Sequence, residues 1–279
     1  MISDLEIGQF HAFGFVVLRG CLEASEMEEL NAAFERWISQ APRYLYFNKD
    51  SQSRMINHVE DQDRIIAALI VHPRIIDTMR DIWGTTCLFI GSNIWSNLDE
   101  TPWHTDNVVG RYTPTIKVTY YLDVQTTDQG SFNVIPSTHH PQWSQALFKN
   151  CGYWDRDRPR LRLDPMSIPG AVSIATRPGD VVLWDNRLWH SALKRKDGRP
   201  RRGVFFQYLP DPQNDLVAMD EAGQQIAHAL SEDHPSLYSE QLLAHNLPEL
   251  NHMADRLASL GHDQGTRHRL VAATNRGTS

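Results

Sequence analysis

Short apolar segments separated by turn residues limit how this 279-residue chain can fold more than any other feature. Four of them have the length and the Val, Ile, Phe and Tyr content of β-strands: residues 116–123, 132–135, 181–184 and 204–209. Glycine-containing turns precede the last three. No regular helices alternate with these segments, as a parallel sheet would require, so we expect antiparallel pairing.

Helices are predicted mainly near the two ends of the chain. Apolar residues recur at helical spacing in three stretches: Asp4 to Phe13, Ala24 to Ser39 and Ser239 to Leu260. Residues 61–83 have the same texture, and Pro73 should divide them into two helices. The tail from Asp263 onward is expected to be frayed. We therefore predict one domain over residues 1–279, mainly β with flanking α-helices.

Two segments show no regular period and are predicted to be irregular: residues 42–58 and 140–177. Loops of this length in a compact domain usually have a function, so we expect them to shape a ligand pocket; ordinary anchoring of the loops by their side chains is the alternative. They offer the aromatic side chains Tyr44, Tyr46, Phe47, Trp143, Phe148, Tyr153 and Trp154, and the charged side chains Arg43, Arg156, Arg158 and Arg160.

Composition excludes several classes of protein. The formal net charge of −7 argues against a nucleic-acid partner, although basic residues gather at 194–202. The cysteines Cys21, Cys87 and Cys151 form no CxxC pair and indicate isolated reduced thiols. Neither a signal peptide nor a membrane span is apparent, so we expect a cytoplasmic protein.

A His-x-Asp motif at His104 and Asp106 is the first sign of chemistry. Side chains two positions apart in extended backbone point to the same side, so an imidazole and a carboxylate can reach one ion together. A second histidine would complete a face of two histidines and one carboxylate, which suits Fe(II) and leaves three positions open. The best third ligand is His190, which follows a turn and the strand 181–184. The motif alone is common, and a loop histidine beside a solvated aspartate is its ordinary reading.

Arg201 follows His190 and stands just before the last predicted strand. Its planar, permanently charged guanidinium suits a carboxylate of a bound ligand. A surface cluster of basic residues is the alternative, because lysines and arginines crowd this stretch, and Arg202 is the adjacent rival.

The ordered set of these motifs resembles the phytanoyl-CoA dioxygenase family. The similarity runs from about residue 5 to 210, and its motifs are the entry at 14–20, the His104–Asp106 pair, residues 122–139, the turn 178–180, His190 and Arg201. The resemblance implies a double-stranded β-helix, also called a jelly roll or cupin-like barrel, with a metal inside one mouth. It also implies Fe(II) bound by His104, Asp106 and His190, and 2-oxoglutarate held at its distal carboxylate by Arg201.

The resemblance is incomplete around the co-substrate. Family members often carry a serine two residues after the distal histidine, where this chain has Ala192, with Ser191 one residue earlier. The usual Pro-Gly-Ser-His stretch is replaced by residues 136–139. Lys117 occupies a strand position where relatives often contact 2-oxoglutarate, although an ordinary solvent-facing lysine is equally compatible with the sequence.

Other residues near these motifs are given structural roles. We expect His139 and His140 to make structural hydrogen bonds, and Trp103 and Trp189 to point away from the metal and pack behind it. Asn93 and Trp95 precede the first ligand; core packing is expected for them, and lining of the pocket is the alternative.

The activity that the resemblance implies is oxidation of a C–H bond of a small-molecule metabolite with O2, releasing succinate and CO2. Related halogenases replace the carboxylate ligand with a small residue, so Asp106 favours hydroxylation, desaturation, epoxidation or ring rearrangement. The alternatives are a cupin isomerase or hydrolase with another metal, and a catalytically silent binding protein. Glycine-rich nucleotide motifs are absent from the sequence. The oligomeric state is not predicted.

Overall fold

A computed structural model describes residues 2–41, 52–61, 63–106, 114–155, 158–164, 167–168, 170–230 and 236–261. Its strands are β1 (Phe15–Leu18), β2 (Arg54–Asn57), β3 (Cys87–Asn97), β4 (Thr101–His104), β5 (Ile116–Tyr121), β6 (Phe132–Val134), β7 (Gly152–Asp155), β8 (Arg158–Leu161), β9 (Val172–Ile174), β10 (Val181–Asp185), β11 (His190–Ala192) and β12 (Arg201–Pro210). Its helices are α1 (Asp4–Phe13), α2 (Ala24–Ile38), α3 (Arg64–Ile70), α4 (Pro73–Trp83), α5 (Pro141–Cys151), α6 (Leu216–Ala229), α7 (Glu240–Leu243) and α8 (Pro248–Leu260).

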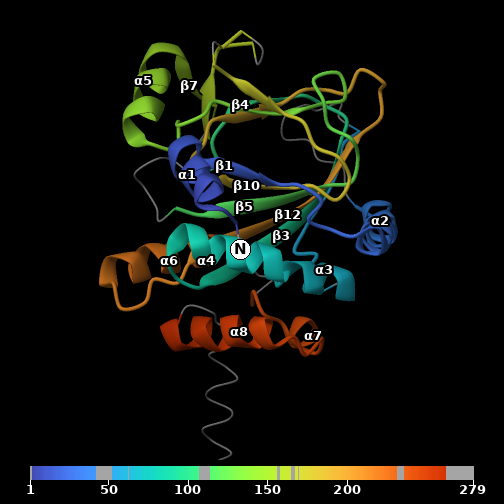
Figure 1. Cartoon of the computed structure of the whole chain (residues 1–279), viewed down its shortest axis with the longest axis vertical. Coiled ribbons are helices and arrows are strands. Elements are labelled where there is room, and N and C mark those ends of the chain that lie inside the picture. The colour runs from blue at the N-terminus through green and yellow to red at the C-terminus, as the bar shows by residue number, and fades with distance from the viewer. Residues whose placement is uncertain are drawn as a thin grey trace, which may run out of the picture.

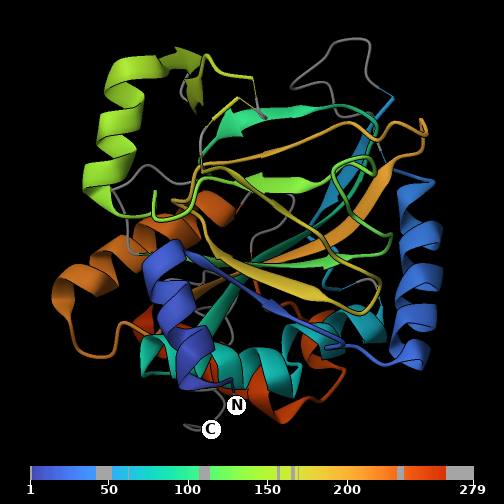
Figure 2. The ribbon, with the colours of Figure 1, turned by 45° about the horizontal axis from the view of Figure 1, so that its top comes forward.

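The strands form two six-stranded sheets that face each other (Figure 1). The first has the order β1-β10-β5-β12-β3-β2 and the second the order β7-β8-β4-β11-β6-β9. Every neighbouring pair of strands is antiparallel, as predicted. Figure 2 shows the two sheets from a second direction, with the top of the molecule turned toward the viewer. The mainly β, jelly-roll prediction is confirmed.

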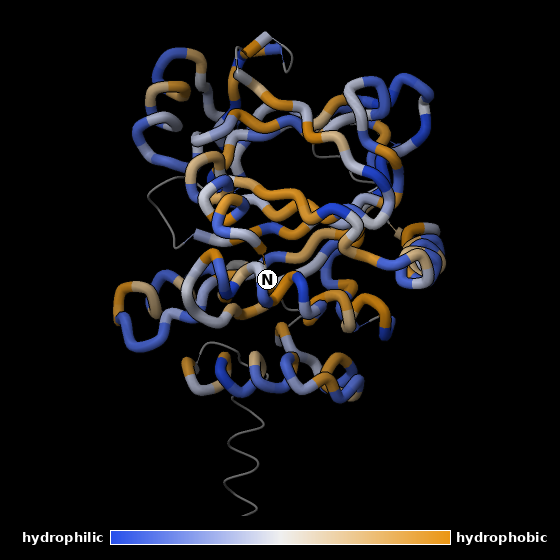
Figure 3. The backbone as a smooth tube through the Cα atoms, in the orientation of Figure 1, coloured by the Kyte–Doolittle hydropathy of each residue, from blue (hydrophilic) through white to orange (hydrophobic). Residues whose placement is uncertain are grey.

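Helices cover the outer face of the first sheet. Figure 1 shows α3 and α4 beneath this sheet and α7 and α8 in a further layer below them. Hydrophobic side chains of these helices and of strands β3, β5, β10 and β12 form one buried cluster. Hydropathy along the chain follows this arrangement, with hydrophobic residues gathered in the central strands (Figure 3). None of the helices in the described part of the chain is long and apolar enough to cross a membrane.

Strand β5 shows how the sheet separates its two faces. Ile116, Val118 and Tyr120 are buried in the cluster beneath the helices. The intervening residues Lys117 and Tyr121 line the cavity between the sheets. The alternation in the sequence therefore places a core face and a site face on one strand.

The four helices predicted in the N-terminal part of the chain are confirmed. Ser3 and Glu6 form a capping box at the start of α1, and Pro73 begins α4 after α3 has ended. The predicted C-terminal helix is two helices, because the chain turns at residues 244–247 and Asn246 adopts a positive φ of 53°. The frayed tail from Asp263 lies outside the described residues.

Both segments predicted to be irregular contain regular structure. β2 lies within 42–58, of which residues 42–51 are outside the described part, and α5, β7, β8 and β9 lie within 140–177. That part of the prediction was wrong. These strands are three or four residues long, and α5 has only Ser144 buried, so the sequence shows little periodicity there. The three cysteines are free, as predicted.

Candidate metal centre

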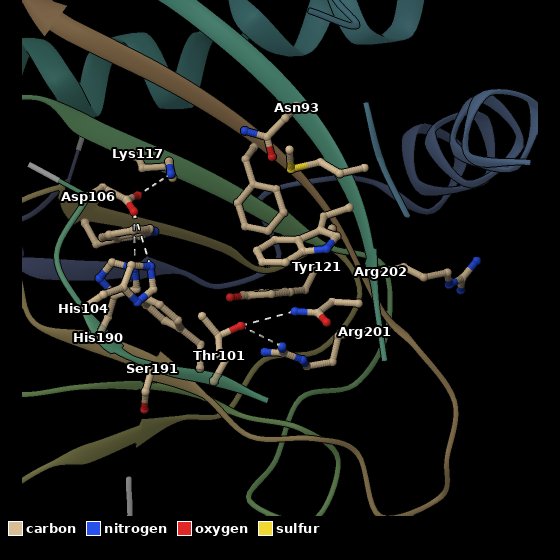
Figure 4. Close-up of a pocket in the computed structure, with 18 of the residues that line it drawn as sticks. Asn93, Thr101, His104, Asp106, Lys117, Tyr121, His190, Ser191, Arg201 and Arg202 are labelled. Atoms are coloured by element: carbon tan, nitrogen blue, oxygen red, sulfur yellow. Dashed lines mark hydrogen bonds and ion pairs between the residues drawn. The ribbon is translucent and has the colours of Figure 1, made fainter. Parts of the chain in front are cut away.

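The adjacent strands β4 and β11 of the second sheet bring His104, Asp106 and His190 together at one end of the cavity (Figure 4). One ligand atom from each residue lies within 4.8 Å of the others. The Nε2 atoms of His104 and His190 are 3.4 and 3.8 Å from the same Asp106 oxygen. Among the described residues, no other group of three histidine, cysteine, aspartate or glutamate side chains has this arrangement.

Strand pairing positions the two imidazoles. His104 at the end of β4 lies directly opposite His190 at the start of β11, and their ring centroids are 4.1 Å apart. Each Nδ1 lies 2.9 Å from the carbonyl oxygen two residues earlier in the chain. A carbonyl only accepts, so each Nδ1–H donates and each Nε2 keeps its lone pair toward the centre.

Asp106 is anchored by both its backbone and its carboxylate. Its amide donates to the Asn186 carbonyl at 3.0 Å, and its carboxylate pairs with the Lys117 ammonium. Burial alone would raise the pKa of Asp106, but Lys117 and the two histidines outweigh it and hold that pKa well below its ordinary value. Burial, together with His104, holds the pKa of His190 well below its ordinary value. A deprotonated carboxylate and a neutral imidazole are the forms that bind a metal.

Lys117 faces the cavity. Its ammonium also lies 5.3 Å from the centroid of the Trp184 ring, and only 17% of its side chain is exposed. The solvent-facing alternative is therefore wrong for this residue. Its predicted contact with 2-oxoglutarate stays a prediction.

Arg201 and its neighbour Arg202 point in different directions (Figure 4). Arg202 pairs with Asp123 and Glu35 on the outer side of β12. Arg201 is buried at 7% exposure and lines the cavity. Gly130, at a φ of 78°, leaves room for its stem, because a Cβ there would lie 2.6 Å from the Arg201 Cδ.

The Arg201 guanidinium has no carboxylate partner among the described residues. One nitrogen donates to the Asp99 carbonyl at 3.0 Å and lies 3.4 Å from the Thr101 hydroxyl, while its buried Nε has no partner. Burial lowers the pKa of Arg201 to about 10, so the group remains charged at neutral pH. Asp99 and Glu100 act on this charge only from a distance, and an anionic ligand would supply the buried cation with a direct partner.

Polar residues beside Arg201 were missed by the sequence analysis. Asn97 donates to the Thr101 hydroxyl at 3.2 Å, and Thr101 pairs across the strands with Ala192. Ser191 is among the residues that line the cavity, but its hydroxyl lies 3.4 Å from the Asn133 amide nitrogen and not beside Arg201, so it does not replace the serine expected at 192 (Figure 4). The pairing of Arg201 with Asn97 in β3 and the turn from β3 into β4 bring Thr101 here, and no local motif could have shown it.

The cavity that connects these groups has a volume of about 280 Å³. Asn93 and Trp95 line this cavity, so the expectation that they pack in the core was wrong and the alternative, lining of the pocket, holds. Met55, Asn57 and Phe205 also line it and were not singled out from the sequence. Of the two segments expected to shape the pocket, 42–58 contributes Met55 and Asn57, and 140–177 contributes Arg158.

The structural roles predicted for neighbouring residues are confirmed. A ring nitrogen of each of His139 and His140 lies within hydrogen-bond distance of the His11 carbonyl, at 3.1 and 3.2 Å. Trp103 and Trp189 are buried in a hydrophobic cluster behind the ligands, and the Trp189 indole donates to Ser144 at 2.9 Å. The basic residues around 194–202 include Arg195, Lys196 and Arg199, each paired with an aspartate.

Two facing antiparallel sheets that hold two histidines and one carboxylate at one end of their cavity define the class of non-haem iron oxygenases. The donor set fits Fe(II), and the Arg201 guanidinium, which has no carboxylate partner among the described residues, fits a carboxylate-bearing co-substrate.

Comparison with known proteins identifies the family within this class. The family model for phytanoyl-CoA dioxygenase (PhyH) matches residues 10–203, and the chain belongs to this family. It is therefore a non-haem, 2-oxoglutarate-dependent iron enzyme, with Fe(II) and 2-oxoglutarate as its cofactors. A search of curated proteins finds no match.

Solved structures confirm the fold at low sequence identity. HygX from Streptomyces hygroscopicus with nickel and 2-oxoglutarate bound is 18% identical, with a TM-score of 0.59 over 75% of this chain and 87% of that one. The epimerase SnoN in complex with Fe3+, alpha-ketoglutarate and nogalamycin RO is 17% identical, with a TM-score of 0.60 over 75% and 83%. Apo EctD from S. alaskensis is 19% identical, with a TM-score of 0.58 over 75% and 78%.

Proposed function

We propose that this protein hydroxylates a C–H bond of a small-molecule metabolite, consuming O2 and 2-oxoglutarate and releasing succinate and CO2. The observation that carries the proposal is one cavity with a two-histidine, one-carboxylate centre at one end and, at the other, a buried arginine that has no carboxylate partner among the described residues. A dicarboxylate that reaches both ends can coordinate the metal with one end and pair with the Arg201 guanidinium through the other.

Each residue of the site has a proposed task. His104, Asp106 and His190 hold the iron, which supplies the oxidising chemistry when it is bound. Arg201 holds the distal carboxylate of 2-oxoglutarate and so fixes the orientation of the co-substrate. Lys117, which already contacts the Asp106 carboxylate, is placed to contact the 2-oxo acid end.

The remaining lining favours a dry, shaped site. Phe132 and Trp184 pack against the His190 ring, with 5.5 and 4.2 Å between ring centroids, and Tyr121 adds a further aromatic ring to the cavity. Exclusion of water directs an oxidant to a positioned C–H bond. Asp106 fills the third ligand position and favours hydroxylation over halogenation. HygX binds hygromycin B, SnoN binds nogalamycin RO, and SnoK is a carbocyclase from nogalamycin biosynthesis. A small-molecule substrate for this chain is consistent with those ligands.

The proposal is tested by adding 2-oxoglutarate to the Fe(II) protein without oxygen. Chelation of the iron should give a weak visible charge-transfer band, and O2 should then yield succinate. A metal-dependent isomerase or hydrolase on this fold would bind iron and show no such band. A catalytically silent protein would show the band and form no succinate with any metabolite in a panel. Either result would overturn the proposal.

Thr101 provides a second test of the co-substrate site. We expect Thr101→Ala to weaken 2-oxoglutarate binding by about tenfold, because the variant removes one hydroxyl beside the Arg201 guanidinium. Titration of the charge-transfer band measures this change. Since Ala192 lies opposite Thr101, Ala192→Ser in the Thr101→Ala background should restore most of the affinity. An unchanged affinity in Thr101→Ala would remove Thr101 from the site.

Two expectations from the sequence stay proposals. We propose that residues 1–279 act as one domain, since the ligands lie on or directly after strands of the second sheet while Lys117 and Arg201 reach the same cavity from the first. The cytoplasmic location remains a prediction.

A further inference from the structure

A patch of uncharged residues occupies the part of the cavity wall formed by β2, β3 and β12. We call it the β2–β3 face; it consists of Met55, Asn57, Asn93, Trp95 and Phe205. Asn57 lies opposite Asn93 and Met55 lies opposite Trp95 in the pairing of β2 with β3, while Phe205 lies opposite Asn93 on β12. Directly opposite residues on one face of a sheet have neighbouring side chains.

The two asparagine amides are available for a ligand. In the described part of the chain, neither the Asn57 nor the Asn93 side chain makes a hydrogen bond. Asn97, farther along β3, is by contrast bonded to Ser53 and Thr101. Asn93 is half-buried and Asn57 is exposed, so the pair runs from the cavity wall to its rim. Each amide offers donors and an acceptor, and two together suit a group with several adjacent hydroxyls.

Charge is placed elsewhere in the cavity. The charged residues among its described lining are Asp106, Lys117, Arg158, Arg201 and Arg202. Asp106 pairs with Lys117 at the metal centre, and Arg202 pairs outward with Asp123 and Glu35. Arg158 belongs to β8 in the other sheet, and Arg201 lies beside Thr101. The β2–β3 face itself therefore presents only neutral groups to its ligand, and the charge that borders it, Lys117, is paired with Asp106.

Aromatic rings stand beside the amides. Trp95 and Phe205 belong to the face, and Tyr121 packs edge-to-face against Phe205 with 6.4 Å between ring centroids. Flat rings offer surface for the C–H side of a saturated ring, while amides bind the hydroxyls at its edge. We infer that the β2–β3 face recognises the substrate and takes a neutral, hydroxyl-bearing ring, such as a sugar or cyclitol unit. This inference rests on the proposed function, because it assigns the substrate of the same site.

The test uses the anaerobic Fe(II) protein loaded with 2-oxoglutarate. Its charge-transfer band is titrated with myo-inositol and methyl β-D-glucopyranoside as neutral probes. Methyl β-D-glucuronide is the anionic control, and tetrahydropyran is the control ring without hydroxyls. We expect a neutral polyol to perturb the charge-transfer band at a lower concentration than either control compound. Failure of both neutral probes, or tighter binding of the glucuronide or tetrahydropyran, would overturn the inference.

Variants connect the response to the amides. The double variant Asn57→Ala/Asn93→Ala should raise the half-saturating concentration of the neutral probe by about tenfold or more. Asn93→Asp keeps the shape of the side chain and removes its two donors, so it should also raise the half-saturating concentration of the neutral probe. This second variant keeps the inference testable if the double variant does not fold. Ser96→Ala changes the opposite face of β3, where Ser96 pairs with Arg54, and should leave the response unchanged. An equal response in the wild type and both asparagine variants would also overturn the inference.

The band itself separates the two possible failures. If it does not form when 2-oxoglutarate is added, the proposed function fails. If it forms in the wild type and in both asparagine variants and the neutral probes do not change it, only the substrate assignment fails.

Discussion

His190→Ala is expected to weaken Fe(II) binding by about 100-fold or more and to abolish succinate formation. The variant removes one of the three ligand atoms, and the remaining pair, His104 and Asp106, comes from one short stretch of chain. Competition with a metal-sensitive dye measures the affinity, and succinate release measures turnover.

His140→Ala is the matched control for that variant. The His140 ring lies near the His11 carbonyl and belongs to no ligand group, so its loss should leave iron affinity unchanged. Retention of iron binding and turnover in folded His190→Ala protein would contradict the assignment of His190.

Arg201→Ala is expected to weaken 2-oxoglutarate binding by about 100-fold while leaving iron affinity nearly unchanged. The guanidinium is buried and lacks a carboxylate partner among the described residues, so its loss removes a charge-assisted contact that little else in the cavity can replace. The two affinities are measured separately, by titration of the charge-transfer band and by dye competition.

Arg202→Ala separates this role from a general loss of positive charge. Arg202 has the same charge one residue away, but it pairs with Asp123 and Glu35 on the outer side of the strand. We expect this variant to keep its 2-oxoglutarate affinity and to lose a little thermal stability. Equal losses of iron and 2-oxoglutarate binding in Arg201→Ala would instead indicate that Arg201 is structural.

The sequence predicted the parts of the site that depend on spacing along the chain. The His104–Asp106 pair projects from one extended segment, and a turn and strand deliver His190, so both could be inferred from local pattern. Lys117 illustrates the limit. Alternation placed it on one face of its strand, but only the opposing sheet shows that this face is the cavity.

Contacts between distant strands could not be predicted in this way. Thr101 is an ordinary residue until β12 pairs with β3 and sets Arg201 beside the turn that leads to Thr101. Asn57 lies on an edge strand whose residues are half-buried or exposed, so no hydrophobic period marked that strand in the sequence. Arg201 and Arg202 are indistinguishable in the sequence, and the pleat of β12 alone sends one inward and the other outward.

The direct pairing of His104 with His190 ties the chemistry to correct assembly of the barrel. Side chains alternate between the two faces of a strand, so pairing β11 out of step by one residue would turn His190 away from the cavity. Such a misassembled chain would offer at most two ligands and would hold iron poorly. The register of one strand pair thus decides both whether the barrel is correctly assembled and whether the protein can hold its iron.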